Sequence, residues 1–73
     1  MAKKGGGTVY RVTEVIGTSS NSWEDAARNA VSTAASSLRD LRIAEIEKLD
    51  VKIEDGKITQ FRARLALSFK YEG

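Results

Sequence analysis

Carboxylate side chains are the residues of this sequence whose type and spacing suit the binding of a metal ion. Glu14 lies in the first half of the chain, and Glu45 and Glu47 lie two residues apart in the second half. Carboxylate oxygens are ligands that Ca²⁺ and Mg²⁺ prefer. The spacing is not that of an EF-hand, and one chain has too few acids to surround a cation. A solvated surface is therefore the simpler interpretation. Copies of the chain related by symmetry would change this, with Glu14 and Glu47 as the expected metal ligands.

The hydroxyl-rich segment 17–22 is the second candidate, because it precedes an expected helix whose first amides could bind a phosphate. It contains no Lys or Arg and matches neither GxxxxGK[ST] nor GxGxxG. Glu24 and Asp25 follow it and would repel an anion. Ser22 and Asp25 instead form a capping box, so we expect this segment to cap a helix rather than to bind a ligand.

Arg62 and Arg64, with Lys70 further along, form a basic stripe on one face of an expected strand. The stripe is either a solvated surface or a binding site for anionic ligands at an interface between copies. The sequence leaves both interpretations open. The formal net charge is +2, from 12 basic and 10 acidic residues. Because this excess is small, we expect no nucleic-acid partner.

Catalytic side chains are scarce in this chain. It contains neither Cys nor His, which removes disulfides, thiolate nucleophiles, zinc sites and imidazole acid–base chemistry. No residue set supplies a nucleophile with a base, so we expect a protein that is not an enzyme. No apolar run is long enough for a membrane span or a signal sequence, so we expect a cytoplasmic protein without a membrane partner.

Hydrophobic periodicity predicts an α+β chain with the order β-α-β-β. Residues 9–16 alternate as a strand, and a helix of about 17 residues follows Ser22. Asp55-Gly56 between two alternating segments predicts a hairpin with a type I′ turn. The first arm changes register along its length, which indicates a β-bulge near residues 47–48. The helix carries one apolar stripe, made of Trp23, Ala26, Ala27, Ala30, Val31, Ala34, Ala35 and Leu38.

The expected elements do not cover one another, which predicts self-association. Each hairpin arm of about 12–15 residues spans about 40–50 Å, whereas the helix covers about 25 Å. The chain of 73 residues is one domain, with a flexible tail at 1–7 and the folded part at 8–73. A domain this small would leave much of a partly apolar sheet bare, so we expect an oligomer. The second arm has one apolar face, made of Phe61, Ala63, Leu65, Leu67, Phe69 and Tyr71.

The sequence resembles the dodecin family, small flavin-binding proteins of twelve subunits. The resemblance is carried by "VYRVTEVIGTSSNSWEDAARNA", "SLRDLRIAEIE", "IEDGKI" and "RLALSFKYE", and it covers nearly everything after the glycine-rich tail. It implies a three-stranded antiparallel sheet that partly wraps one helix, and a hollow homododecamer. It also implies that segment 17–22 supports assembly, while flavin binds elsewhere, on the sheet.

The flavin positions that the resemblance implies carry other residues here. Ile43 stands where the family has a Trp that stacks on the flavin ring, and Arg62 stands where it has a Gln. Glu45 and Arg64 are the neighbouring cofactor-binding candidates. Ile43 lacks a flat face and Arg62 cannot accept a hydrogen bond, although Arg62 could pair with the phosphate of FMN. Trp23 is not a substitute, because it lies on the helix stripe and should pack against the sheet.

The expected function is therefore a shell that binds, stores or buffers a small ligand. Flavin, as FMN or riboflavin, is the ligand of the family, and we expect its binding to be weakened or lost. A shell that holds Ca²⁺ or Mg²⁺ and a purely structural or partner-binding oligomer remain as alternatives.

Overall fold

The computed structural model describes residues 7–70, which form one helix and three strands. The elements are β1 (Tyr10–Ser19), α1 (Trp23–Ala35), β2 (Leu41–Glu54) and β3 (Lys57–Lys70). This order confirms the predicted β-α-β-β chain. Six of the seven residues of the expected tail, and Tyr71 of the expected apolar face, lie outside the described residues.

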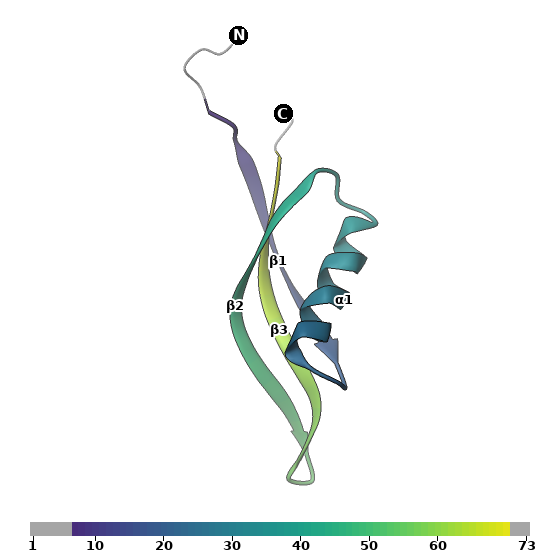
Figure 1. Ribbon diagram of the computed structural model, residues 1–73. Helices are drawn as coiled ribbons and strands as arrows, with labels where there is room; N and C mark the ends of the chain where they lie inside the picture. Colours follow the sequence, from purple (N-terminus) through teal and green to yellow (C-terminus); the bar gives the residue numbers. More distant parts are fainter. Residues whose placement is uncertain (1–6, 71–73) are drawn as a thin grey trace.

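The strands form one antiparallel sheet in the order β1-β3-β2, with α1 against one face (Figure 1). The last strand lies in the middle because α1 carries the chain from β1 to the far edge, and the hairpin then returns it between the two. The α+β fold with a partly wrapped helix is therefore confirmed. The side chains of β3 alternate between the helix-facing side and the opposite side, which we call the open face.

The helix begins as predicted and ends earlier than predicted. The Ser22 hydroxyl accepts a hydrogen bond of 3.0 Å from the Asp25 amide, which confirms the cap. The helix has 13 residues rather than about 17, because Ser36 and Ser37 follow Ala35. Their hydroxyls donate to the carbonyls of the preceding turn at 2.7 and 3.4 Å, and such local bonds compete with further helix.

The hairpin and its bulges set which side chains reach the open face. Asp55 and Gly56 have φ angles of 52° and 75°, as the predicted type I′ turn requires. The register of β2 against β3 shifts between Ile46 and Lys48, which confirms the predicted bulge. Two further shifts, between Leu41 and Ile43 and between Lys52 and Ile53, were not predicted.

The core is thin and consists mostly of alanine. Three helix residues pack on the middle strand, where Leu65 and Leu67 are the large side chains that are fully buried. Gly17 of β1 allows this approach: a Cβ there would lie 2.1 Å from the Ala26 carbonyl oxygen and 2.7 Å from the Ala30 Cβ. The core cluster is Ala26, Ala30, Ala34, Ala63, Leu65 and Leu67.

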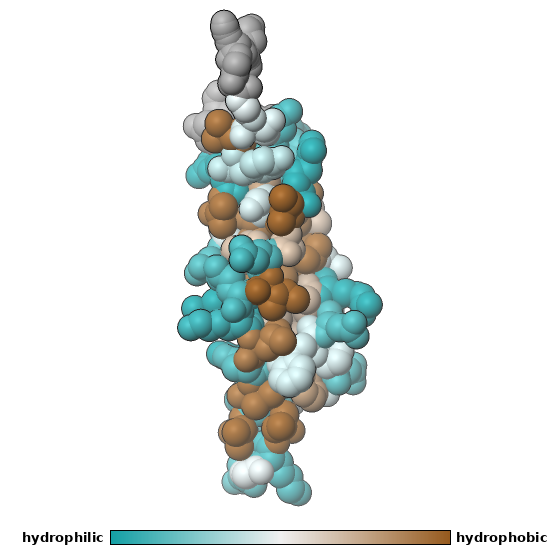
Figure 2. All heavy atoms as spheres, turned by 60° about the vertical axis from the view of Figure 1, so that its left-hand side comes forward, coloured by the Kyte–Doolittle hydropathy of each residue, from teal (hydrophilic) through white to brown (hydrophobic). Residues whose placement is uncertain are grey.

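The molecule is elongated and leaves apolar side chains exposed. Its extents are 58 × 20 × 16 Å, and its radius of gyration is 15.6 Å, against about 11 Å for a compact domain of this length. Its accessible area is 5295 Å², against about 4,450 Å² for a compact monomer of this mass. Hydrophobic side chains are exposed along nearly the whole length (Figure 2). In the described residues, we find no helix with the length and apolar character to cross a membrane.

Candidate functional site

All of the predicted site residues lie on the open face of the sheet. Ala63, Leu65 and Leu67 point to the helix, so Arg62 and Arg64 point to the other side. Residues directly opposite in an antiparallel pair share a face. The register therefore adds Ile43, opposite Ser68, and both Glu14 and Glu45, opposite Ala66.

Glu47 joins them from the bulge. Its carboxyl group meets that of Glu14 within hydrogen-bonding reach, so two strands that do not neighbour each other bring their acids together across β3. Ala66 is the β3 residue opposite both Glu14 and Glu45, and Glu47 is the unpaired bulge residue two positions beyond Glu45. The structure thus places the two predicted metal ligands in contact within one chain, where the sequence suggested that copies of the chain would be needed.

The environment raises the pKa of Glu47 above the ordinary value of 4.5. Desolvation is the largest cause, followed by the hydrogen bond with Glu14 and the negative charges of Glu14 and Glu45. The positive charge of Arg64 partly offsets them. Two carboxyl groups this close are costly to ionise together, and either a proton or a cation relieves the repulsion.

Beside this pair the surface is hollowed. A shallow depression of about 230 Å³ is lined by Glu14, Val15, Ile16 and Arg64. No group of three or more acidic, His or Cys side chains converges anywhere in residues 7–70 in a manner that could hold a metal. A single chain therefore offers a pair of carboxylates, and a cation there needs further ligands from water or from other copies.

The predicted flavin residues are not brought together in one chain. Ile43 lies opposite Ser68, whereas Arg62 lies six residues away along β3, a separation of about 20 Å. Ile43 is 55% exposed and has an apolar but not flat side chain. A ligand that contacts both residues of one chain must span this distance.

Arg62 is not free to receive a ligand in this structure. Its Nε and Nη2 donate to the two carboxylate oxygens of Asp50 at 2.7 and 2.9 Å, which is a bidentate pair. The same pair lowers the pKa of Asp50 below its ordinary value of 3.8, chiefly through the hydrogen bond from Arg62. A simple hairpin register from the sequence does not place Asp50 opposite Arg62, because the β3 bulge at Thr59 shifts the register by one residue.

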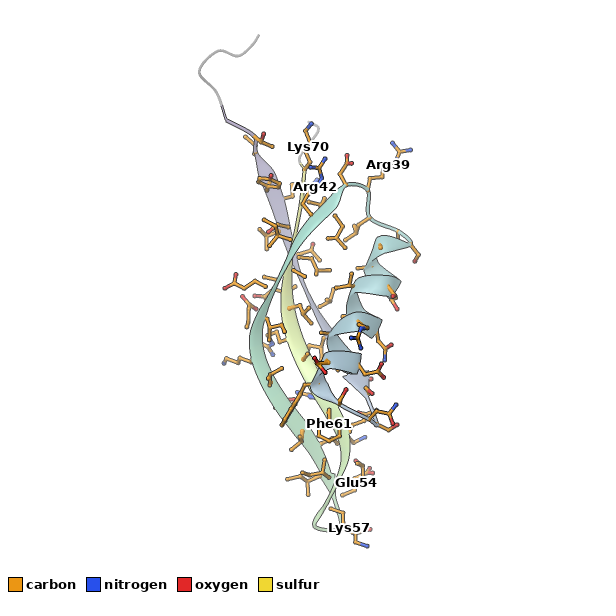
Figure 3. All side chains as sticks on the ribbon, in the orientation of Figure 1. Arg39, Arg42, Glu54, Lys57, Phe61 and Lys70 are labelled. Carbon is orange, nitrogen blue, oxygen red and sulfur yellow. The ribbon has the colours of Figure 1, made fainter. Side chains whose placement is uncertain are left out.

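Trp23 packs against the sheet, as predicted. Its ring lies edge-on to Phe61 of β3, with 5.2 Å between the ring centroids and 77° between the planes. Its indole Nε1 donates to the Asp50 backbone carbonyl at 3.0 Å. Phe61 lies beside the start of α1 (Figure 3). Trp23 thus joins the helix start to both hairpin strands and is not available to stack on a ligand at the open face.

Comparison with known proteins decides the family. A family model described as Dodecin matches residues 9–72, which is most of the chain. The chain belongs to the dodecin family. A dodecin described as calcium dodecin, from Mycobacterium tuberculosis, is 45% identical over 64 residues, which cover 86% of this chain and 89% of the relative.

Solved dodecin structures share the fold. Dodecin from Streptomyces coelicolor is 41% identical, with a TM-score of 0.85 over 90% of this chain and 94% of that one. The Mycobacterium tuberculosis calcium dodecin, whose crystal structure is described as having a novel calcium-binding site, is 42% identical, with a TM-score of 0.79 over 89% and 93%. The dodecin fold of the chain that was inferred from the sequence is thereby confirmed.

Proposed function

We propose that the chain assembles into a dodecin shell of twelve subunits that binds Ca²⁺ through Glu14 and Glu47 and does not act as an enzyme. The observation that carries this proposal is the contact between the two carboxyl groups on the open face. A divalent cation at this place replaces the shared proton and removes the repulsion that raises the pKa of Glu47.

Assembly supplies what the single chain lacks. Calcium takes six to eight oxygen ligands, roughly, and two carboxylates provide four at most. The exposed apolar side chains and the elongated shape both favour burial against other copies. In a closed shell, symmetry brings copies of the Glu14–Glu47 pair from different subunits together, and water completes the coordination of the cation.

One relative supports the choice of calcium over magnesium. The Mycobacterium tuberculosis relative at 45% identity is described as a calcium dodecin. Magnesium demands a small octahedral arrangement, whereas calcium accepts irregular sets of carboxylates, as expected for a site on a sheet surface.

Thermal unfolding with and without cations tests the cation site. Calcium should raise the melting temperature of chelator-treated wild-type protein, and magnesium should raise it less. The variant Glu47→Gln should lose the calcium effect, while Glu54→Gln, which removes an acid paired with Lys52 at the hairpin end, should keep it. Equal calcium shifts in wild type and Glu47→Gln would reject the site.

Sedimentation tests the assembly separately from the ligand. We expect a species of about twelve times 8.0 kDa in the presence of chelator. A stable monomer at micromolar concentration would be incompatible with the shell.

Flavin is the second candidate ligand, because it is the ligand that the family resemblance implies. Exposed Ile43 offers apolar contact to a flavin ring. The Asp50–Arg62 pair and the missing aromatic ring weaken this candidate. Titration of riboflavin and FMN with the protein should leave most flavin fluorescence unquenched, and strong quenching at low micromolar protein would restore flavin as the ligand.

A further inference from the structure

A cluster of basic side chains surrounds Asp50 on the open face. The register places Lys48 opposite Arg64, and Asp50 opposite Arg62. Residues two apart on a strand share a face, so Lys48 and Lys52 flank Asp50 along β2, and Arg64 lies diagonally across from it. We call Lys48, Lys52, Arg62 and Arg64 the basic patch.

Asp50 provides the negative charge at the centre of this patch. Its carboxylate holds Arg62 in the two-pronged geometry that guanidinium groups also use for phosphate. The positive charge of Arg64 acts on the same carboxylate. Lys52 has a second partner, Glu54, at 3.6 Å, at the outer end of the patch.

The pair is held in place and is open to solvent. In the single chain the side chains of Arg62 and Asp50 are 40% and 53% exposed, so a dissolved ligand can reach them from the open face. The backbone at Asp50 is fixed by the bond from the Trp23 indole to its carbonyl. Because this bond involves the main chain, replacing the Asp50 side chain leaves it intact.

We propose that Asp50 is a specificity-determining residue: its carboxylate occupies the anion position of the basic patch and so excludes phosphate-bearing small molecules from Arg62. A phosphate that approaches Arg62 must displace a carboxylate tethered in the same chain and must tolerate its negative charge nearby. Removing the carboxylate leaves four cations without an acid between them, which is a phosphate site by charge and geometry.

This inference goes beyond the proposed cation function and does not depend on it. Glu14 and Glu47 border the basic patch only at Arg64, away from the Asp50–Arg62 pair, and the experiment is run in chelator. Failure of calcium binding therefore leaves its expected results unchanged.

Matched ligands that differ by one phosphate give the test. The full-length variant Asp50→Asn should bind FMN about tenfold more tightly than the wild type does, because the patch loses its resident anion. Riboflavin, which lacks the phosphate, should bind both proteins equally, and inorganic phosphate should displace FMN from the variant. Equal FMN affinity in the two proteins, including no binding by either, would overturn the proposal, as would an equal gain for riboflavin.

Two further variants control for the change of charge and for the partner. Asp40→Asn removes an acid 3.9 Å from Arg42, away from the patch, and should leave FMN affinity unchanged. Asp50→Asn combined with Arg62→Gln should lose the gain. A gain from Asp40→Asn, or one that survives Arg62→Gln, would mean that overall charge rather than the pair governs binding.

A measurement on the wild type covers the case in which Asp50→Asn does not fold. The NMR chemical shift of the Arg62 Nε–H group should stay constant as millimolar inorganic phosphate is added, because this group already donates its hydrogen bond to Asp50. A phosphate-dependent shift of this resonance would show that the carboxylate does not exclude the anion, and the proposal would fall.

Discussion

We propose that the carboxyl groups of Glu14 and Glu47 form the cation site of the open face. They belong to β1 and β2, which do not pair with each other, and they meet across β3. Sequence reasoning named both residues because carboxylates suit calcium. Their contact within one chain could not be read from the sequence, because it depends on how the bulge at Glu47 directs that side chain.

The raised pKa of Glu47 predicts a pH dependence of stability. The Glu47 carboxyl group holds its proton more tightly in the folded state than in the unfolded chain. Glu47 therefore favours folding at a pH below 4.5, where its carboxyl group is largely protonated in both states. That contribution is lost as the pH rises from about 4.5 through the raised pKa. Without divalent cations, the free energy of unfolding of the wild type should therefore fall, relative to Glu47→Gln, across this window.

Denaturant unfolding at a series of pH values measures this difference. Glu54→Gln is the control, because it removes a carboxylate that lies at the hairpin end, away from Glu14. Its stability relative to the wild type should show no corresponding trend. Parallel pH profiles for the wild type and Glu47→Gln would show that the two carboxyl groups do not repel each other in solution.

Gly17 is the residue on which the helix–sheet distance depends. In the variant Gly17→Ala, the new methyl group would overlap the Ala26 carbonyl oxygen, at 2.1 Å, so the helix must move. We expect destabilisation by about 1–3 kcal/mol in denaturant unfolding, as for other overpacked cores. Gly7→Ala is the matched control, since no atom lies within 4 Å of a Cβ there. Equal stability of the two variants would mean that the helix lies farther from β1.

At the scale of the elements, local signals predicted the type of each one and missed some boundaries. The Ser22 cap, the Asp55-Gly56 turn and the bulge near residue 47 are all encoded by short stretches, and all were found. The helix end was wrong because Ser36 and Ser37 bond back to the last turn. The β3 bulge at Thr59 has no comparable local signal. Without this bulge, a simple hairpin register does not place Asp50 opposite Arg62.

The alanine stripe of α1 predicts a position-dependent effect of larger side chains. Ala30 is 7% exposed and faces Gly17, so Ala30→Leu should lower the free energy of unfolding by about 1–3 kcal/mol. Ala35, which the sequence analysis placed on the stripe, is exposed in the structure, so Ala35→Leu adds the same atoms there and should change stability little. Equal effects of the two substitutions, measured by denaturant unfolding, would show that the stripe is not closely packed.

At the scale of the whole molecule, the isolated chain is an incomplete unit. The hairpin extends past the helix, and Ile53 and Ile58 near its end are more than half exposed. Figure 3 shows the acid Glu54 and the base Lys57 at that end, and Arg39, Arg42 and Lys70 at the other. Strand and helix lengths alone predicted this mismatch, and hence self-association. The proposed ligand-binding role relies on contacts between copies, which one chain's sequence does not specify.

Calorimetric titration of Ca²⁺ into chelator-treated, assembled protein is the most direct test of the central claim. The wild type should bind calcium, and the double variant Glu14→Gln/Glu47→Gln should lose that binding while keeping its sedimentation coefficient. Removal of both carboxylates takes away the charged ligands that calcium needs on the open face. Calcium binding by the double variant equal to that of the wild type, or no binding by the wild type, would contradict the account.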